Sequence, residues 1–130
     1  MAGFSDYLED KVLDHVFGGT SFTAPSSLHV ALYTSAPSDT GGGTEVSGGS
    51  YARQTATFNV SGTNPTTATN AAAVEYPTAT GDYGTVVAVG IFDASSSGNL
   101  LAYASLTANK TVSTGDVFRF DAGDIDITLA

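Results

Sequence analysis

The sequence predicts a mainly β protein: a single antiparallel β-sandwich or jelly-roll-like domain with one N-terminal α-helix. Three observations lead to this prediction. Helical periodicity is confined to the start of the chain, alternation of apolar and polar residues begins at Leu28, and turn-forming segments separate the later alternating runs. No helical pattern lies between these runs, so consecutive strands are expected to pair antiparallel and to close into packed sheets.

The predicted helix covers residues 3–18. Ser5 can cap its N-terminus, and two glycines, Gly18 and Gly19, follow its last turn as is common at helix C-termini. A helix this short is marginally stable alone, so its apolar stripe must pack against something. The residues of this stripe recur at spacings of three and four and share one face: Phe4, Tyr7, Leu8, Val12, Leu13, Val16 and Phe17.

Alternating segments after the helix predict about six to eight strands. Residues 85–92 are apolar on both faces, which predicts a central strand. Within residues 125–129 apolar and polar side chains alternate, which predicts one solvent-exposed face. The sandwich is therefore expected over 28–130, and one domain over 1–130. The expected strands are Leu28 to Tyr33, Tyr51 to Phe58, Ala71 to Tyr76, Thr85 to Phe92, Leu100 to Thr107, Val117 to Asp121 and Ile125 to Leu129.

Charge and composition exclude several kinds of partner. Thirteen acidic and four basic side chains give a net charge of −9, which opposes binding to nucleic acid and to anionic lipid. No stretch approaches the roughly 18 apolar residues that span a bilayer, and the N-terminus lacks the pattern of a signal peptide. Cysteine is absent, so disulfides and thiolate metal sites are excluded. We expect synthesis in the cytoplasm, with no nucleic-acid and no membrane partner.

A glycine-rich segment, GTEVSGGSYARQTATF at residues 43–58, leads from a flexible loop into an alternating strand. Tyr51 and Arg53 are expected to share one face of that strand. Because Arg forms forked bonds with carboxylates, we expect Arg53 to pin the loop by pairing with an acid of its own chain or of a neighbouring copy. Such an anchored loop also suits a surface that adapts to partners.

The sequence contains no pattern typical of a catalytic site. A hydrolase triad needs a base, and both histidines are better explained as structural, His15 at the helix C-terminus and His29 within the first strand. Glu45 and Glu75 are the candidate pair of a glycoside hydrolase, but nothing in the sequence orders them. We therefore expect no catalytic residue, no cofactor and no enzyme activity.

Four aspartates near the C-terminus form the candidate metal site: Asp116, Asp121, Asp124 and Asp126. Carboxylates of this kind suit Ca²⁺, but the spacing in DAGDID lacks the ligand order of an EF-hand loop. Asp124 and Asp126 also share one face of a strand, as residues of a solvated edge do. A solvated edge is the preferred interpretation, calcium binding is the alternative, and no metal ligand is assigned.

Five segments span nearly the whole chain: DYLEDKVLDHVFGGTSFTAP, LHVALYTSAPSD, GGGTEVSGGSYARQ, NAAAVEYPTATGDYGTVVAVGIFDASSSGNLL and TANKTVSTGDVFRFDAGDIDITL. The ordered combination of EVSGGSYAR, ATGDYGTV, GIFDA and TGDVFRF is specific, although each piece alone is weak. Together the segments resemble a family of small tailed-phage virion proteins commonly labelled phage tail fibre protein. The resemblance implies a part of the virion and carries no catalytic residues.

These observations predict a non-enzymatic structural protein on the exterior of a tailed-phage virion. It would act as a capsid-decorating or cement protein or as a globular tail-fibre component. Its expected partners are further copies of itself, as a homo-oligomer and expected trimer, and other virion proteins of the capsid or tail. The alternative is a receptor- or glycan-binding module that uses tyrosines around the loop, from among Tyr33, Tyr51, Tyr76 and Tyr83. The residues expected to mediate assembly are Phe4, Leu8, Val12, Val16, Phe17, Tyr51 and Arg53.

Overall fold

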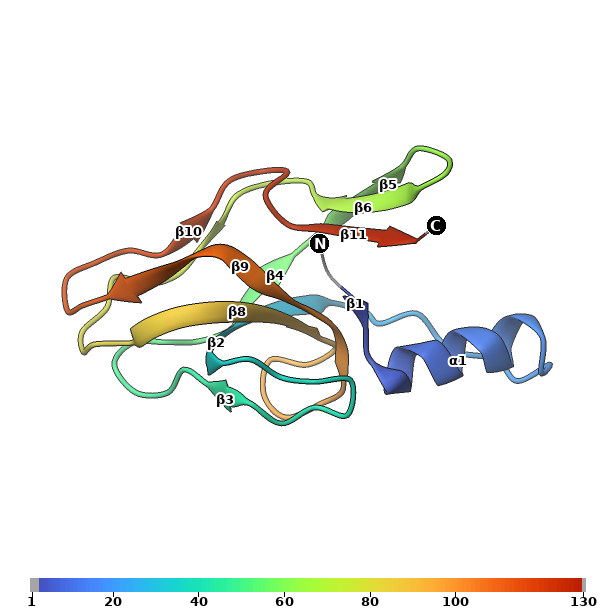
Figure 1. The fold of residues 1–130 in the computed structure, drawn as a ribbon, viewed down its shortest axis with the longest axis horizontal. Helices are drawn as coiled ribbons and strands as arrows, with labels where there is room; N and C mark the ends of the chain where they lie inside the picture. Colours follow the sequence, from blue (N-terminus) through green and yellow to red (C-terminus); the bar gives the residue numbers. More distant parts are fainter. Residues whose placement is uncertain (1–2, 130) are drawn as a thin grey trace.

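Figure 1 shows a computed structural model of the protein, which describes residues 3–129. This part of the chain contains one helix, α1 (Asp6–Val16), and eleven strands. The strands are β1 (Gly3–Phe4), β2 (Leu28–Ser35), β3 (Thr44–Glu45), β4 (Gln54–Ala56), β5 (Phe58–Ser61), β6 (Thr66–Asn70), β7 (Val74–Glu75), β8 (Gly84–Phe92), β9 (Leu100–Val112), β10 (Arg119–Phe120) and β11 (Asp126–Leu129).

The main sheet contains six strands in the order β1-β9-β8-β2-β3, with β4 also paired to β2. All of these pairs are antiparallel. Strand β8 lies between β9 and β2, which confirms the central position predicted from its apolar residues on both faces. Its two faces belong to two different hydrophobic clusters, one on each side of the sheet.

A second layer covers one face of the main sheet and consists of two smaller antiparallel sheets, β11-β6-β5 and β10-β7. The larger hydrophobic cluster fills the space between the layers and includes Val30, Val86, Tyr76 and Phe118. The Tyr76 hydroxyl is buried there and donates a hydrogen bond to the Val30 carbonyl at 2.7 Å, so the one polar atom of this side chain is satisfied. These layers confirm the predicted mainly β, antiparallel sandwich with one N-terminal helix.

Several strand boundaries differ from the prediction. Residues 71–76 were expected to form one strand, but β6 ends at Asn70 and only Val74–Glu75 pairs again, as β7. The turn-rich segment SGTNPTTATN contains β6, because its turn is limited to the residues around Pro65 and the threonines that follow favour a strand. The number of strands exceeds the prediction mainly because β1, β3, β7 and β10 are only two residues long.

The helix is shorter than predicted and extends from the body of the protein. Gly3 and Phe4 form β1, which pairs with β9, so the helix begins after Ser5, the predicted N-cap. Helix α1 projects beyond the end of the main sheet, and none of its residues is buried (Figure 1). Within one chain, the predicted apolar stripe is therefore only partly packed.

Candidate assembly surfaces

Ser5 attaches helix α1 to the main sheet by hydrogen bonds. The buried Ser5 hydroxyl donates to the Leu100 carbonyl at 2.5 Å and accepts from the Leu8 amide at 3.2 Å. Its backbone N–H donates to the Leu101 carbonyl at 2.8 Å, and the Asp6 N–H donates to the Asp39 carbonyl at 3.0 Å. These bonds fix the direction in which the helix leaves the sheet, so we call α1 with its return segment, residues 17–25, the arm.

One side of the helix is covered by the return segment. The Phe22 ring packs edge-on against Tyr7 with centroids 6.5 Å apart, and the Phe22 amide donates to His15 Nδ1 at 3.0 Å. Leu8 and Val12 are half-buried. The predicted structural role of His15 takes this form: it holds the return segment against the last turn of the helix.

The other apolar residues of the helix remain uncovered at its far end. Leu13, Val16 and Phe17 are 58%, 60% and 81% exposed. They are three and four positions apart, so they form one patch on the last turn, which we call the arm tip. Exposed apolar residues that cluster in this way are typical of interaction surfaces.

A second uncovered apolar surface lies on the small sheet β11-β6-β5. Ile127 pairs with Ala68, and Ala68 pairs with Val60, so these three side chains share one face of the sheet. Ile127 packs against the main core, which identifies this face as the core-facing one. Nevertheless Val60 and Leu129, which is two residues after Ile127 on the same face, are 70% and 59% exposed. The sheet therefore extends past the core, and we call Val60, Ala68, Ile127 and Leu129 the overhang.

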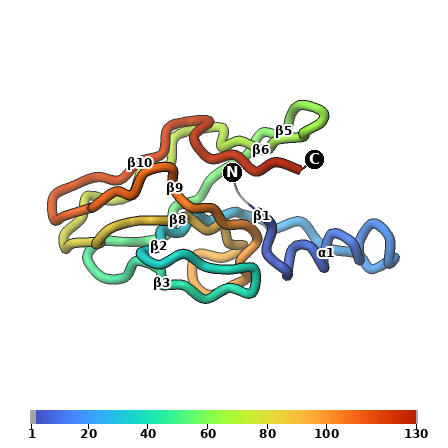
Figure 2. Tube along the Cα trace, in the orientation of Figure 1, coloured from blue at the N-terminus to red at the C-terminus, as the bar shows by residue number. Residues whose placement is uncertain are grey.

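The arm tip and the overhang lie at the same end of the molecule's long axis (Figures 1 and 2). They contain five of the six large hydrophobic residues that are exposed within residues 3–129. The sixth, Val117, lies two residues before β10, and β10 lies toward the opposite end (Figure 2). The exposed apolar surface is thus concentrated rather than scattered.

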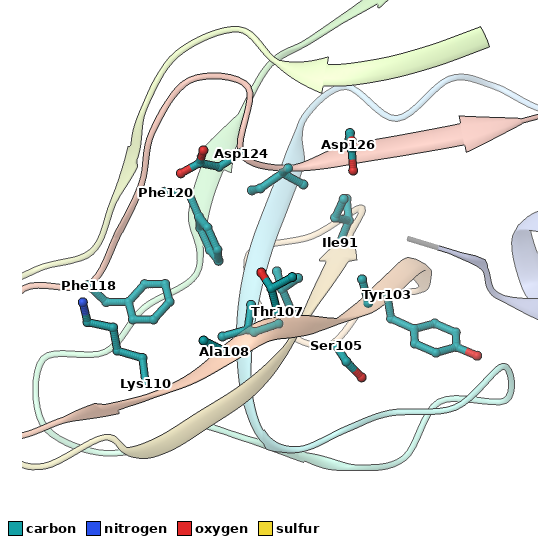
Figure 3. Close-up of a pocket in the computed structure, with 14 residues that line it drawn as sticks. Ile91, Tyr103, Ser105, Thr107, Ala108, Lys110, Phe118, Phe120, Asp124 and Asp126 are labelled. Carbon is teal, nitrogen blue, oxygen red and sulfur yellow. The ribbon is translucent and has the colours of Figure 1, made fainter. Parts of the chain in front are cut away.

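A cleft of about 400 Å³ lies between β9 and the β10–β11 segment (Figure 3). Phe120 points toward β9, Lys110 lies beside Phe118 at one end, and Tyr103 lies at the other. Asp124 and Asp126 also line the cleft. The pairing of β9 with β8 shifts register between Ser105 and Lys110, so β9 bulges along this cleft.

Tyr51 and Arg53 precede β4 instead of lying on a strand as predicted, and their side chains converge on Glu45. Arg53 binds the Glu45 carboxylate with two hydrogen bonds of 2.8 and 2.9 Å, and the Tyr51 hydroxyl donates to the same group at 2.6 Å. The guanidinium also stacks on Phe92, 3.8 Å from the ring centre, and donates to the carbonyls of Ala94 and Ser97. The glycine-rich segment is thereby joined to the loop at residues 93–99.

Electrostatics in this cluster favour the ion pair. Burial raises the pKa of the Glu45 carboxyl, but the hydrogen bonds from Arg53 and Tyr51 lower it more, so its pKa lies below the ordinary value. Burial and the bond to Glu45 raise the pKa of the Tyr51 hydroxyl, which therefore stays protonated and donates. The cluster stabilises two loops of its own chain, and an additional contact of Tyr51 or Arg53 with a neighbouring copy stays a prediction.

The structure separates the other candidate residues. Glu45 and Glu75 belong to different ion pairs, with Arg53 and with Arg119. His29 is buried, and its Nε2 lies 2.9 Å from the Ser27 hydroxyl. The predicted structural role of His29 thus rests on one ring nitrogen, since within residues 3–129 no partner reaches its buried Nδ1.

Of the four C-terminal aspartates, Asp116 and Asp124 stabilise turns and Asp121 pairs with an arginine. Asp116 and Asp124 each accept the backbone N–H of the residue three positions earlier, and Asp121 accepts from Arg119 at 2.9 Å. No group of three or more potential metal ligands comes together in the part of the chain that the structure describes. No helix in this part is long and apolar enough to cross a bilayer.

The tyrosines named for sugar stacking are mostly in the interior. Tyr33, Tyr76 and Tyr83 are buried, and Tyr51 is partly buried between Tyr76 and Tyr83. The proposed stacking platform is therefore wrong for these residues, because Tyr51, Tyr76 and Tyr83 pack between the layers and Tyr33 packs in the smaller cluster on the other face of the main sheet. Sequence reasoning also missed the overhang. The only signal was the alternation of Phe58 and Val60, which does not show where the core ends.

Comparison with known proteins places the chain among phage fibres. No curated protein matches the sequence. The family model described as Podophage GP4 fiber I protein gp80 matches residues 3–128, nearly the whole chain and all the elements above except the last residue of β11. The match agrees with the tailed-phage resemblance of the sequence. The chain therefore belongs to the Podophage GP4 fiber I protein gp80 family, a family of phage fibre proteins.

Proposed function

We propose that the protein is a non-enzymatic structural subunit of a tailed-phage fibre and that it acts by assembling with further copies of itself. One observation carries this proposal. Hydrogen bonds of Ser5 attach the arm to the main sheet, and the apolar arm tip stays exposed at the same end of the molecule as the overhang. Apolar surface arranged in this way favours association over a monomeric state.

The fibre is a better location than the capsid surface, because the description of the matched family names a fibre. With 130 residues folded into a sandwich, the subunit would be a globular part of the fibre. We expect a closed ring, because most soluble homo-oligomers have closed symmetry. The expected number of copies is three. Contacts with other virion proteins would then occur outside the ring interface.

A structural role also agrees with the hydrogen bonding of the titratable residues. His15 holds the return segment, Glu45 binds Arg53, and Asp116 and Asp124 cap turns. Each of these candidate acids and bases forms a hydrogen bond that stabilises the fold. The second candidate function, receptor or glycan binding, is favoured by the cleft beside β9, whose volume lies within the range of small-ligand sites.

Self-assembly is tested by comparing two matched substitutions of exposed apolar residues. Phe17→Asp places a charge on the arm tip, and Val117→Asp makes the same kind of change toward the opposite end. Sedimentation and light scattering should show an oligomer for the wild type and for Val117→Asp but a monomer for Phe17→Asp. Circular dichroism should show that all three are folded, because Phe17 is exposed in the single chain.

A monomeric wild-type protein at tens of micromolar would contradict the self-assembly proposal, and so would an unchanged oligomer for Phe17→Asp. Cryo-electron microscopy of intact particles tests the location separately. Density for the subunit on the fibre is expected, and regular density over the capsid shell would assign it to decoration instead.

A further inference from the structure

The single chain leaves two different apolar surfaces uncovered. The arm tip is one turn of an amphipathic helix, and the overhang is the core-facing side of a small sheet. A sheet face of this kind is stable when another layer covers it, and a helix is a common cover. The helix of the arm tip is therefore a suitable cover for the exposed sheet face of the overhang.

The helix does not cover the overhang of its own chain. Helix α1 contacts β1 and β9, and it leaves the sheet in a direction set by the hydrogen bonds of Ser5 and Asp6. Val60 and Leu129 stay more than half exposed with the arm in this position. Moving the arm onto them within one chain would break the bonds of the buried Ser5 hydroxyl, which is costly.

Building on the self-assembly proposed above, we propose that the arm tip of one copy packs against the overhang of the next copy. The interface is then heterologous, with a helix from one subunit on a sheet from its neighbour. Such an interface forms a ring when the rotation between subunits closes. This arrangement covers both surfaces with a single repeated contact.

Charge permits a second copy to occupy the overhang, because the two apolar surfaces are uncharged. The chain carries a net charge of −9, so two copies repel each other over most of their surface. The arm tip and the overhang contain only uncharged residues, Leu13, Val16 and Phe17 on one side and Val60, Ala68, Ile127 and Leu129 on the other. Two copies can meet here without bringing their carboxylates into direct contact across the centre of the interface.

The two patches also supply a large part of the area that an interface needs. The exposed parts of these side chains together present on the order of 500 Å² of apolar surface. A standard interface of about 1,600 Å² contains roughly 900 Å² of apolar surface, so the two patches supply more than half of it. Polar residues around them, such as Thr66 and Ser61, would supply a rim.

The absence of cysteine from the sequence allows a direct test by cross-linking. Val16→Cys on the arm tip and Val60→Cys on the overhang are close in size to the native residues, so each variant should keep the oligomer. Each variant is purified alone, and the two are then mixed, allowed to exchange subunits and treated with a short bis-maleimide. The control replaces Val60→Cys with Asn59→Cys, which lies next to it on the opposite face of β5.

Cross-linked dimers are expected in the mixture of Val16→Cys with Val60→Cys, with little product from either variant alone or from the mixture with Asn59→Cys. Product from Val16→Cys alone would show that arm tips meet each other and would overturn the inference. An oligomer that yields no product from the mixture would also overturn it, while leaving the proposed function intact. A wild-type monomer would instead contradict the proposed function itself.

Discussion

Arg53 is the residue on which two loops of the molecule depend. Its side chain is only 7% exposed, and its donors bind the Glu45 carboxylate and the carbonyls of Ala94 and Ser97. Stacking on Phe92 adds a cation–π contact. The Glu45 side chain is 26% exposed, so the ion pair is partly buried, and removing one partner leaves the other charge unpaired at a greater cost than in a fully exposed pair.

We predict that Arg53→Ala lowers the free energy of unfolding by roughly 1–3 kcal/mol, between the cost of losing an exposed ion pair and that of breaking a buried one. Arg53→Lys should be intermediate, because Lys keeps the charge but loses the fork that binds both carboxylate oxygens. The exposed Lys110→Ala is the control, with an expected change within about 0.5 kcal/mol. Urea unfolding at a fixed protein concentration measures all three, and equal losses for Arg53→Ala and Lys110→Ala would show that the Arg53 cluster contributes little.

At the scale of elements, the tight packing of β8 depends on a glycine. A Cβ atom at Gly90 would lie 2.9 Å from Tyr33 Cε1 and 3.0 Å from Leu100 Cδ1. Both of these neighbours are buried in the smaller hydrophobic cluster, so neither can move away easily. The glycine lets the rings of Tyr33 and Phe92 pack across the central strand.

We predict that Gly90→Ala lowers the free energy of unfolding by roughly 1–3 kcal/mol through overpacking. Gly3→Ala is the matched control, since a Cβ there meets no heavy atom within 4 Å and the backbone needs no positive φ. Thermal unfolding monitored by circular dichroism distinguishes the two. A stability for Gly90→Ala equal to that of Gly3→Ala would mean that the cluster around β8 adjusts without cost.

At the scale of the whole molecule, assembly combines an apolar contact with like-charge repulsion. Each copy carries a net charge of −9, and the proposed contact surfaces are uncharged. Salt shortens the distance over which charges act, from about 10 Å at 0.1 M to about 3 Å at 1 M. Screening should therefore weaken the repulsion between copies and leave the apolar attraction in place.

We predict that the dissociation constant of the oligomer falls several-fold when NaCl is raised from 0.1 to 1 M, values that span these screening lengths. Sedimentation equilibrium of the wild type at several salt concentrations measures the effect, and Phe17→Asp should stay monomeric throughout. A dissociation constant that rises with salt would indicate that ion pairs between copies hold the assembly together.

Local patterns in the sequence predicted the parts of the fold that depend on neighbouring residues. The Ser5 cap, the helix after it and the central position of β8 follow from side chains that are at most a few positions apart. The boundaries of β6 and β7 were missed, because pairing with β11 and β10 selects among several segments that have similar local preferences.

The sequence by itself determined that this protein is an antiparallel β-sandwich with one amphipathic helix, because periodicity and caps are local properties of the chain. Only the tertiary structure decided which apolar residues stay exposed. Val60 and Val30 both alternate with polar or small neighbours, yet one lies past the end of the core and the other lies at its centre. Likewise Arg53 meets carbonyls 41 and 44 positions away, and contacts over such separations arise only when distant segments are folded together.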